Sequence, residues 1–269
     1  MKLIATLILI VALGAGSAAC TPVQPAGCGG SVRIGAPDDI AGMLVDRAVR
    51  LAPTNLQRTD DGLEVYGLRD CCSTNSQYAL SSDSLDLAVL CPGAAADLVS
   101  KDRRFVVIGP LIENSDVVVT RSGAIVARMG VTQNRSYQLD IVREVVGSEA
   151  TVVPMMTTSL PYALEKGIVD GIVIDAVKAL SVPGDRRPSA PAQGDRVTYV
   201  LVAREDLLGS ERYSMAIDLL GRAAEALNDP AVFGEEASRA TGRSVTAEEV
   251  EEWQTLRVRL LHVSETARF

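Results

Sequence analysis

An internal repeat constrains the fold of this chain more than any other feature of its sequence. Residues 71–89 match residues 155–173 without a gap, and each copy carries Tyr-Ala-Leu, a later Asp and a later Val at the same spacing. Upstream, Arg33-Ile34-Gly35 matches Arg128-Met129-Gly130. A shared hydrophobic rhythm between two βαβ units would not require the same Tyr, the same Asp and an ungapped alignment. The sequence therefore predicts two halves of one design.

Strand-like and helix-like segments alternate in both halves. The strand-like segments are residues 31–34, 63–68, 85–90, 105–108, 127–131, 151–153, 171–174 and 197–203. The helix-like segments are residues 40–52, 94–99, 136–146, 160–166, 213–227 and 247–261, and a polar loop is expected over 183–193. Alternation at this spacing is typical of βαβ units with parallel strands.

We therefore predict an α/β protein of two lobes, each with a parallel-rich sheet, joined by strands that cross between them at a hinge. Lobe I comprises residues 31–115 and 197–269, and lobe II comprises residues 116–196. Hydrophobic residues make up 47% of the chain, which is sufficient for a full core.

The amino-terminal segment has the organisation of an export signal. A basic residue precedes an apolar run over residues 3–12, and small residues then lead to Cys20. The run is too short for a membrane span, so residues 1–19 are expected to be a signal peptide. Cys20 resembles the lipidated cysteine of the bacterial lipobox, although Ser17 stands where that motif usually has Leu. We expect export, a lipid anchor at Cys20 and a flexible tether over residues 20–30; cleavage by ordinary signal peptidase stays an alternative.

Charge and composition argue against several classes of function. A formal net charge of −8 is unsuited to binding nucleic acid, which calls for a basic face. Aromatic residues make up 4% of the chain, whereas binding proteins for sugars or flat rings usually stack such ligands on Trp and Tyr. The only histidine, His262, lies near the end of the chain, away from any expected Ser or Cys nucleophile. We expect a monomer that is not an enzyme and needs no cofactor.

The segment from Tyr162 to Asp175, YALEKGIVDGIVID, resembles the second-lobe signature of type II periplasmic binding proteins of ABC importers. Residues 200–208, VLVAREDLL, fit the returning strand of that family, in which the sulfonate and thiamine-precursor binders are the nearest large group. This resemblance implies a two-lobed type II fold, an extracytoplasmic substrate-binding protein, and an ABC transporter permease as its partner.

A narrower resemblance rests on Asp70-Cys71-Cys72-Ser73 together with Cys91-Pro92-Gly93. These residues are similar to those of the SaoB family, the substrate-binding subunits of the selenocysteine-assisted organometal transport system. Some members of that family are selenoproteins, whereas every candidate position of this chain is cysteine. The resemblance implies an organometal ligand.

Ligands of open parallel sheets bind beyond the carboxyl ends of the strands, at helix N-termini. The candidate ligand-binding residues all fall in loops at such strand ends: Asp38, Asp39, Cys71, Cys72, Ser73, Cys91, Asn134, Thr157, Thr158 and Asp175. In the repeat, Asp175 takes the place of Cys91, and the pair Met155-Met156 takes the place of Cys71-Cys72.

Three of these candidates are expected to bind metal through sulfur: Cys71, Cys72 and Cys91. Thiolates select soft metals, so mercury, arsenic(III) or an organometal cation fits them best. A helix N-terminus behind the paired cysteines would also lower their pKa and favour the thiolate. Zinc is less suited because the usual Cys-x-x-Cys spacing is absent.

Other interpretations stay open. Exported cysteines are usually structural disulfides, and Cys91 could pair with either Cys71 or Cys72. The ligand would then be a small molecule such as a sulfonate or a thiamine precursor. A hydrolase or a sensor domain on the same fold is an alternative of another class. The first would need a histidine near the cleft, and the second an attached kinase or DNA-binding segment.

Overall fold

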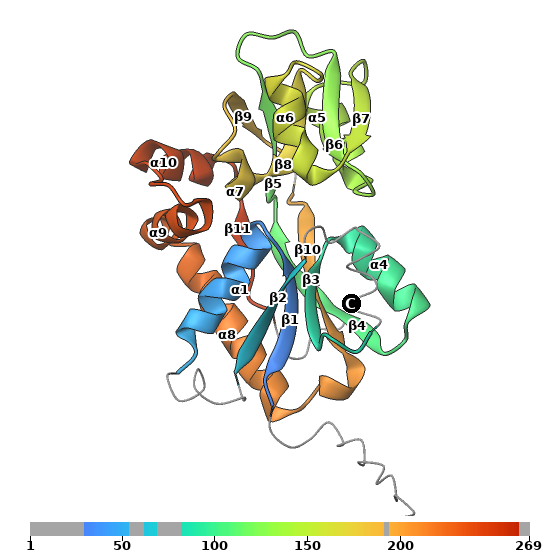
Figure 1. The fold of residues 1–269 in the computed structure, drawn as a ribbon, viewed down its shortest axis with the longest axis vertical. Helices are drawn as coiled ribbons and strands as arrows, with labels where there is room; N and C mark the ends of the chain where they lie inside the picture. Colours follow the sequence, from blue (N-terminus) through green and yellow to red (C-terminus); the bar gives the residue numbers. More distant parts are fainter. Residues whose placement is uncertain (1–29, 54–61, 69–81, 191–193, 264–269) are drawn as a thin grey trace, which may run out of the picture.

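The computed structural model describes residues 30–53, 62–68, 82–190 and 194–263, which form two stacked lobes (Figure 1). The expected signal peptide, the anchor Cys20, the tether up to residue 29, and the loop with Cys71, Cys72 and Ser73 lie outside the described residues. No helix in the described part of the chain combines the length and the apolar composition of a membrane span. The predicted α/β fold class is confirmed.

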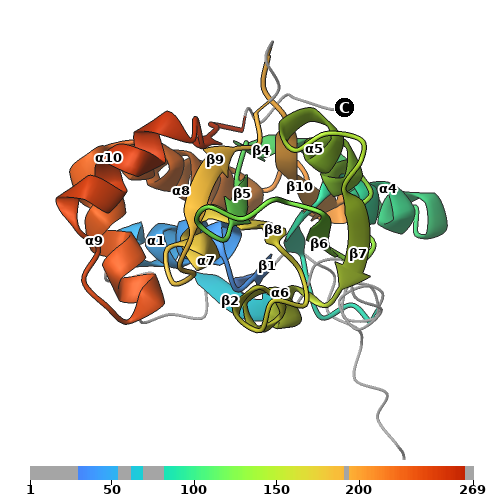
Figure 2. The ribbon, with the colours of Figure 1, turned by 90° about the horizontal axis from the view of Figure 1, so that it is seen from above.

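Lobe I contains a six-stranded sheet with the order β11-β4-β10-β3-β1-β2. Its strands are β1 (Val32–Pro37), β2 (Leu63–Leu68), β3 (Leu87–Leu90), β4 (Phe105–Glu113), β10 (Val197–Arg204) and β11 (Arg259–Leu260). Its helices are α1 (Ile40–Leu51), α4 (Pro92–Lys101), α8 (Glu211–Leu227), α9 (Pro230–Thr241) and α10 (Ala247–Thr255), with a 3-10 turn over Glu205–Leu207. Helices α1 and α8 pack together on one face of the sheet, and α4 covers the other (Figure 1 and Figure 2).

Lobe II contains a five-stranded sheet with the order β7-β6-β8-β5-β9. Its strands are β5 (Asp116–Thr120), β6 (Arg128–Thr132), β7 (Thr151–Met155), β8 (Gly171–Asp175) and β9 (Asp185–Pro188). Its helices are α5 (Tyr137–Val145), α6 (Leu160–Glu165) and α7 (Ala176–Ala179), with a 3-10 turn over Thr157–Ser159. Strands β5 and β8 are buried along their whole length, as expected of strands at the centre of a covered sheet.

Both sheets are mixed around a parallel core of three strands. Strand β1 runs parallel to β2 and β3, and β6 runs parallel to β7 and β8. Strand β10 runs antiparallel to β3, and β5 runs antiparallel to β8. Each of these two strands enters its sheet directly from the other lobe, and β11, which is antiparallel to β4, has the same direction as β10.

The repeat seen in the sequence is present in the strand register. Ile34 lies opposite Leu87 in lobe I, and Met129 lies opposite Gly171 in lobe II. These four positions are the ones that the sequence alignment pairs. The first and third strands of the two lobes are therefore equivalent residue by residue.

The repeated Asp has the same structural role in both lobes. Asp86 accepts a hydrogen bond from Arg33 N at 2.9 Å, and Asp170 accepts one from Arg128 N at 2.9 Å. The guanidinium of Arg33 pairs with Asp86, and that of Arg121 pairs with Asp170. Burial alone would raise the pKa of both carboxyls, but the hydrogen bonds from these arginines and from the backbone lower it. The repeated Asp thus fixes the first strand of each lobe to the third.

The ungapped alignment fails at the second strand of each lobe. Leu68 lies opposite Pro37 at the end of β2, and Met155 lies opposite Thr132 at the end of β7. Pro37 and Thr132 hold equivalent places, so Leu68 rather than Cys71 is the equivalent of Met155. The predicted equivalence of the cysteine pair with the methionine pair is wrong, because the connection between the second and third strands is longer in lobe I.

Helix α9 was not predicted, although its boundaries carry the usual signals. It begins at Pro230 behind Asp229, whose side chain accepts hydrogen bonds from the first turn. It ends at Gly242, which has the left-handed φ of 69° that favours glycine. Its large apolar residues, Val232 and Phe233, are adjacent and do not recur at the spacing of a helix face, so the hydrophobic pattern does not predict it.

Two short strands replace other predicted features. Strand β9 lies within the expected loop 183–193; its Asp, Arg and Pro residues are tolerated because it is an edge strand that pairs only with β5 among the described strands. The last helix ends at Thr255 rather than at residue 261. Arg257 has a φ of 59°, which turns the chain into β11.

The first turn of α1 leaves no room for a side chain at Gly42, where a Cβ would lie 2.5 Å from the backbone oxygen of Pro37. We predict that Gly42→Ala lowers the free energy of unfolding by about 1–3 kcal/mol, despite the higher helix propensity of Ala. Gly93→Ala, in the first turn of α4, is the matched control because a Cβ there meets no described atom within 4 Å. It is expected to be neutral or to stabilise by up to about 1 kcal/mol. Equal effects in urea denaturation would contradict this account.

Candidate functional site

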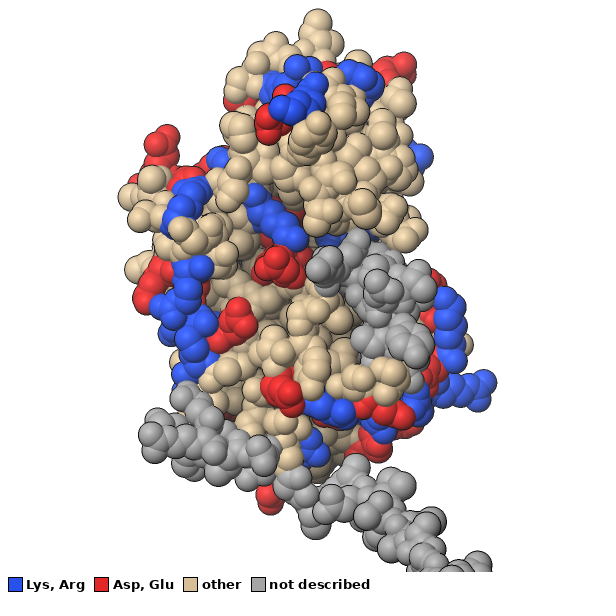
Figure 3. Space-filling view, viewed as in Figure 1, with Lys and Arg blue, Asp and Glu red and all other residues tan. Residues whose placement is uncertain are grey.

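The carboxyl ends of β1 and β3 in lobe I face those of β6 and β8 in lobe II (Figure 1). Asp39 follows β1 and caps α1 by accepting a hydrogen bond from Ala41 N. Cys91 follows β3 at the N-cap position of α4, and Asp175 ends β8 and caps α7. The surface is hollowed between the lobes (Figure 3). Each lobe thus presents helix starts and polar side chains to the other.

The guanidinium of Arg135, from lobe II, lies at the centre of this junction and is 4% exposed. Its Nη2 donates to Tyr199 Oη at 2.9 Å, and its Nη1 donates to Asp116 Oδ1 at 3.4 Å. Tyr199 Oη in turn donates to Asp39 Oδ2 at 2.5 Å, and Arg135 Nη2 is 4.0 Å from the same carboxylate oxygen. The guanidinium also lies 5.4 Å from the centre of the Tyr199 ring, within the range of a cation–π contact. One cation of lobe II is thus bound by two residues of lobe I.

Asp116 anchors this arrangement within lobe II. Its Oδ2 accepts hydrogen bonds from Tyr137 Oη at 2.8 Å and from Gln138 Nε2 at 2.9 Å. Gln138 Oε1 accepts a hydrogen bond from the backbone N–H of Thr132, which fixes the amide orientation. With Arg135 on Oδ1, both oxygens of the buried carboxylate are satisfied, as a buried charge requires.

Asp175 is the third carboxyl of the junction and is 2% exposed. Its Oδ1 accepts hydrogen bonds from Val177 N at 2.9 Å and from Ile40 N of lobe I at 3.3 Å. Asp175 also lies directly opposite Asp116 in the ladder between β8 and β5. Burial, and then the charges of Asp39 and Asp116, raise the pKa of Asp175 well above its usual value.

Three of the predicted ligand-binding residues lie buried here: Asp39, Cys91 and Asp175. Cys91 and Asp175 hold equivalent places, since each follows the third strand of its lobe and begins a helix. The pKa of Tyr137 is raised well above its usual value, chiefly by burial, then by Asp116, and to a smaller extent by Cys91. Cys91 of lobe I therefore acts electrostatically on a phenol of lobe II.

The remaining predicted residues lie at the periphery or outside the described residues. Asp38, Asn134 and Thr158 are exposed, and Asn134 has a left-handed φ of 65°. Thr157 is half-buried, and its hydroxyl lies 3.2 Å from Thr132 Oγ1. The residues that the structure does not describe, whose role stays a prediction, are Cys71, Cys72 and Ser73.

The sequence reading missed four residues that build the junction: Asp116, Arg135, Tyr137 and Tyr199. Asp116 carried a usable signal, because a charged residue at the start of an otherwise apolar strand needs a partner. Arg135 adjoins the predicted Asn134 in the same loop. Tyr199 carried no usable signal, since an aromatic residue inside the apolar run 197–203 is typical of any buried strand.

Within residues 30–53, 62–68, 82–190 and 194–263, no three His, Cys, Asp or Glu side chains are grouped so as to hold a metal ion. The carboxyls of Asp39, Asp116 and Asp175 are thus not arranged as a metal site. Only Cys91 of the predicted sulfur ligands lies in the described part of the chain, so the metal site stays a prediction.

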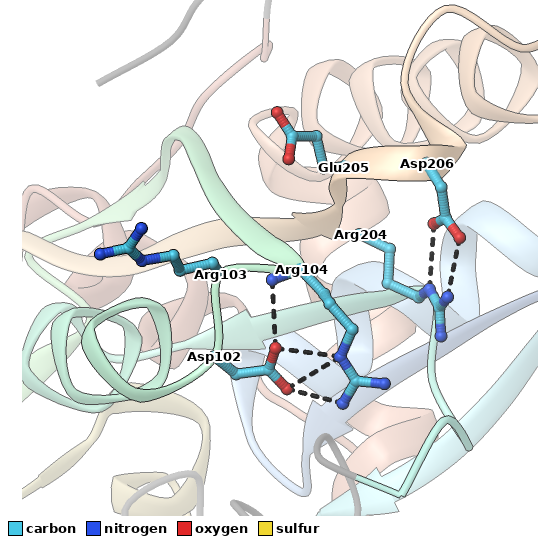
Figure 4. Close-up of a pocket in the computed structure, with 6 residues that line it drawn as sticks. All are labelled: Asp102, Arg103, Arg104, Arg204, Glu205 and Asp206. Carbon is cyan, nitrogen blue, oxygen red and sulfur yellow. Dashed lines mark hydrogen bonds and ion pairs between the residues drawn. The ribbon is translucent and has the colours of Figure 1, made fainter.

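A pocket of about 490 Å³ lies elsewhere on lobe I and is lined by Asp102, Arg103, Arg104, Arg204, Glu205 and Asp206 (Figure 4). It adjoins the start of β4 and the end of β10, whereas the junction between the lobes adjoins the opposite ends of these strands. Arg104 pairs with Asp102 and Arg204 pairs with Asp206, each at 2.7 Å. The guanidinium groups of Arg104 and Arg204 are therefore paired with carboxylates of the same pocket.

The comparisons with solved structures bear on the fold. The chain is similar to the ligand-binding component of an ABC-type import system from Staphylococcus aureus with zinc bound, at a TM-score of 0.67 and 13% identity over 87% of this chain and 86% of that one. It is also similar to the alkanesulfonate-binding protein SsuA from Xanthomonas axonopodis pv. citri bound to MOPS, at a TM-score of 0.62 and 15% identity over 87% of each chain. The fold is that of a type II periplasmic binding protein.

A putative methionine-binding lipoprotein from Bacillus subtilis shares this fold, at a TM-score of 0.58 and 10% identity over 74% of this chain and 94% of that one. The first of these three structures belongs to an ABC-type import system. No family model matches the sequence, and no curated protein matches it.

The raised pKa of Asp175 predicts a pH-dependent stability. The pKa of Asp175 is near 4 in the unfolded state and is raised in the folded state. At a pH between these two values, the folded state holds a proton that the unfolded state has released. The contribution of Asp175 to the free energy of unfolding therefore falls as pH rises. The Asn side chain of the Asp175→Asn variant keeps an oxygen that can cap α7, but it cannot ionise. We expect the stability of this variant, relative to the wild type, to increase from about pH 4 to about pH 8 in urea denaturation.

Asp170→Asn is the control with the opposite sign. The pKa of Asp170 is lowered, so its contribution is present above its usual pKa and is lost as pH falls through the lowered one. The variant should be less stable than the wild type at neutral pH and approach it in acid. A pH-independent difference for Asp175→Asn would contradict the account.

Proposed function

We propose that this chain is the extracytoplasmic substrate-binding subunit of an ABC transporter, and that it binds a small ligand between its lobes and delivers it to a permease. The observation that carries the proposal is the junction around Arg135, where strand-end residues of both lobes converge. The type II fold supports it, because similar structures include the ligand-binding component of an ABC-type import system and the periplasmic substrate-binding protein of an ABC transporter. The signal-like amino terminus and Cys20 support export and a lipid anchor.

We propose that lobe I (residues 31–115 and 197–269) and lobe II (residues 116–196) move as two bodies about the crossing segments. Asn114 has a left-handed φ of 55°, donates to Asp195 at 2.8 Å and accepts from Arg196 N at 2.8 Å. Ser115 Oγ lies 2.7 Å from Thr198 Oγ1. These bonds link the two crossings to each other, which supports a hinge with a defined axis.

Contacts between lobe II and the region of helix α10 indicate on which side the two lobes can separate. Arg186 of lobe II pairs with Glu252 of α10 at 2.9 Å, and Arg243 donates to the backbone oxygen of Leu180 in lobe II. Because lobe II contacts α10 at this side, opening would occur mainly at the side where Cys91 and Thr157 lie.

The ligand that the cysteines favour is an organometal or another soft metal species. Cys91 is buried at the start of α4, at the end of β3 that faces lobe II. The loop with Cys71 and Cys72 follows the second strand of lobe I, so its sulfurs are expected to approach Cys91. A soft cation with an apolar group would suit such sulfur ligands.

Titration with methylmercury tests this ligand class. The protein is reduced with a phosphine, freed of reductant without oxygen, and titrated as wild type, Cys72→Ser and Cys91→Ser. We expect each variant to lose many-fold affinity, because each thiolate supplies much of the coordination energy. Cys28→Ser is the control and should bind as the wild type does, since Cys28 lies in the tether.

Unchanged affinity in both variants would dispose of the organometal ligand. The ligand would then be a small molecule of another class, and the cysteines would be structural. A sulfonate is the first such candidate to test, because one similar structure is an alkanesulfonate-binding protein.

A further inference from the structure

The second oxygen of Asp175 has no evident structural use. Oδ1 accepts the hydrogen bonds that cap α7 and the one from Ile40 N, whereas Oδ2 is buried and has no hydrogen-bond partner among the described residues. A buried polar atom without a partner is unfavourable, and more so when it is charged.

Helix capping does not account for a carboxyl at this position. Asn caps a helix start as well as Asp does and brings no charge. In lobe I the equivalent place is held by Cys91, whose side chain makes no capping hydrogen bond. The two other acids of the repeat, Asp86 and Asp170, each pair with an arginine. Asp175 thus carries a carboxyl where Cys91 does not, and unlike Asp86 and Asp170 its carboxyl is not paired with an arginine in the described part of the chain.

The charges around Asp175 are unbalanced. Asp39 and Asp116 share the single guanidinium of Arg135, at 4.0 and 3.4 Å. Lys178 lowers the pKa of Asp175, but its effect is smaller than those of the two carboxylates. Without a further cation Asp175 stays protonated up to its raised pKa, and its ionised form becomes favourable only beside a partner of opposite charge. An additional cation at Oδ2 would satisfy the oxygen and balance the cluster.

We propose that the ligand carries a nitrogen cation, an ammonium or amidinium group, that donates to Asp175 Oδ2 beside Asp39 and Asp116. The proposal rests on one part of the proposed function, the binding of a small ligand between the lobes. It assigns that ligand a nitrogen cation, in place of the soft metal species and the sulfonate that are the other candidates. An N–H cation fits better than a metal ion because the described carboxyls are not grouped as metal ligands. A sulfonate group placed at the same oxygen would meet three carboxyls and be repelled.

Thermal unfolding in the presence of matched probes tests the charge of the ligand. The probes are methylammonium, ethanolamine and putrescine, each against the sulfonate of the same carbon skeleton: methanesulfonate, isethionate and butane-1,4-disulfonate. We expect at least one of the ammonium compounds to raise the Tm of the wild type, by roughly 3–6 °C at ten times its Kd. The matched sulfonate should leave Tm unchanged at equal ionic strength.

Two variants locate the effect. Asp175→Asn, which keeps the cap, should lose the ammonium-induced shift. Asp140→Asn, on the exposed face of α5 in the same lobe, should keep it. An equal shift in Asp175→Asn and wild type, or no shift with any ammonium compound, would overturn the proposal. A shift with a sulfonate alone would overturn it while leaving the proposed small-molecule binding in place.

Discussion

The architecture depends on one buried cation shared between two lobes. Arg135 lies on lobe II, yet its guanidinium is held by Asp39 and Tyr199 of lobe I as well as by Asp116 of its own lobe. A buried ion pair adds little net stability, because desolvation of the charges offsets most of their attraction. Loss of one partner is nevertheless strongly unfavourable, by about 3–5 kcal/mol, since it leaves a buried charge unpaired. The network therefore specifies one arrangement of the lobes rather than adding to the overall stability.

The duplication explains why the two lobes meet in this way. In each lobe an Asp next to the third strand accepts a hydrogen bond from the backbone N–H of an Arg in the first strand. Both lobes therefore direct the same strand ends toward the junction. The lobes differ where the third strand meets the next helix, with Cys91 in one and Asp175 in the other. A site formed by such a pair is asymmetric, with sulfur on one side and a carboxyl on the other.

Much of this fold was predictable because its signals are local. The repeat, the apolar strands and the strand-end loops could be read from the sequence, and they led to Asp39, Cys91 and Asp175. The mixed sheets and Arg135 could not be read in the same way. Strand β5 reads like any buried strand, and only its entry from the other lobe makes it antiparallel. The role of Arg135 depends on Tyr199, which lies far from it in the chain and is placed beside it by the crossing of β10.

The central claim is that Arg135 couples the lobes through Asp39, and a double-mutant cycle tests it most directly. The free energy of unfolding is measured at neutral pH for the wild type, Asp39→Asn, Arg135→Gln and the double variant. The account predicts a coupling free energy of about 1–3 kcal/mol between the two sites, because each single substitution leaves the other group without its charged partner across the junction. Effects that add to within about 0.5 kcal/mol would contradict it, since independent sites behave in that way.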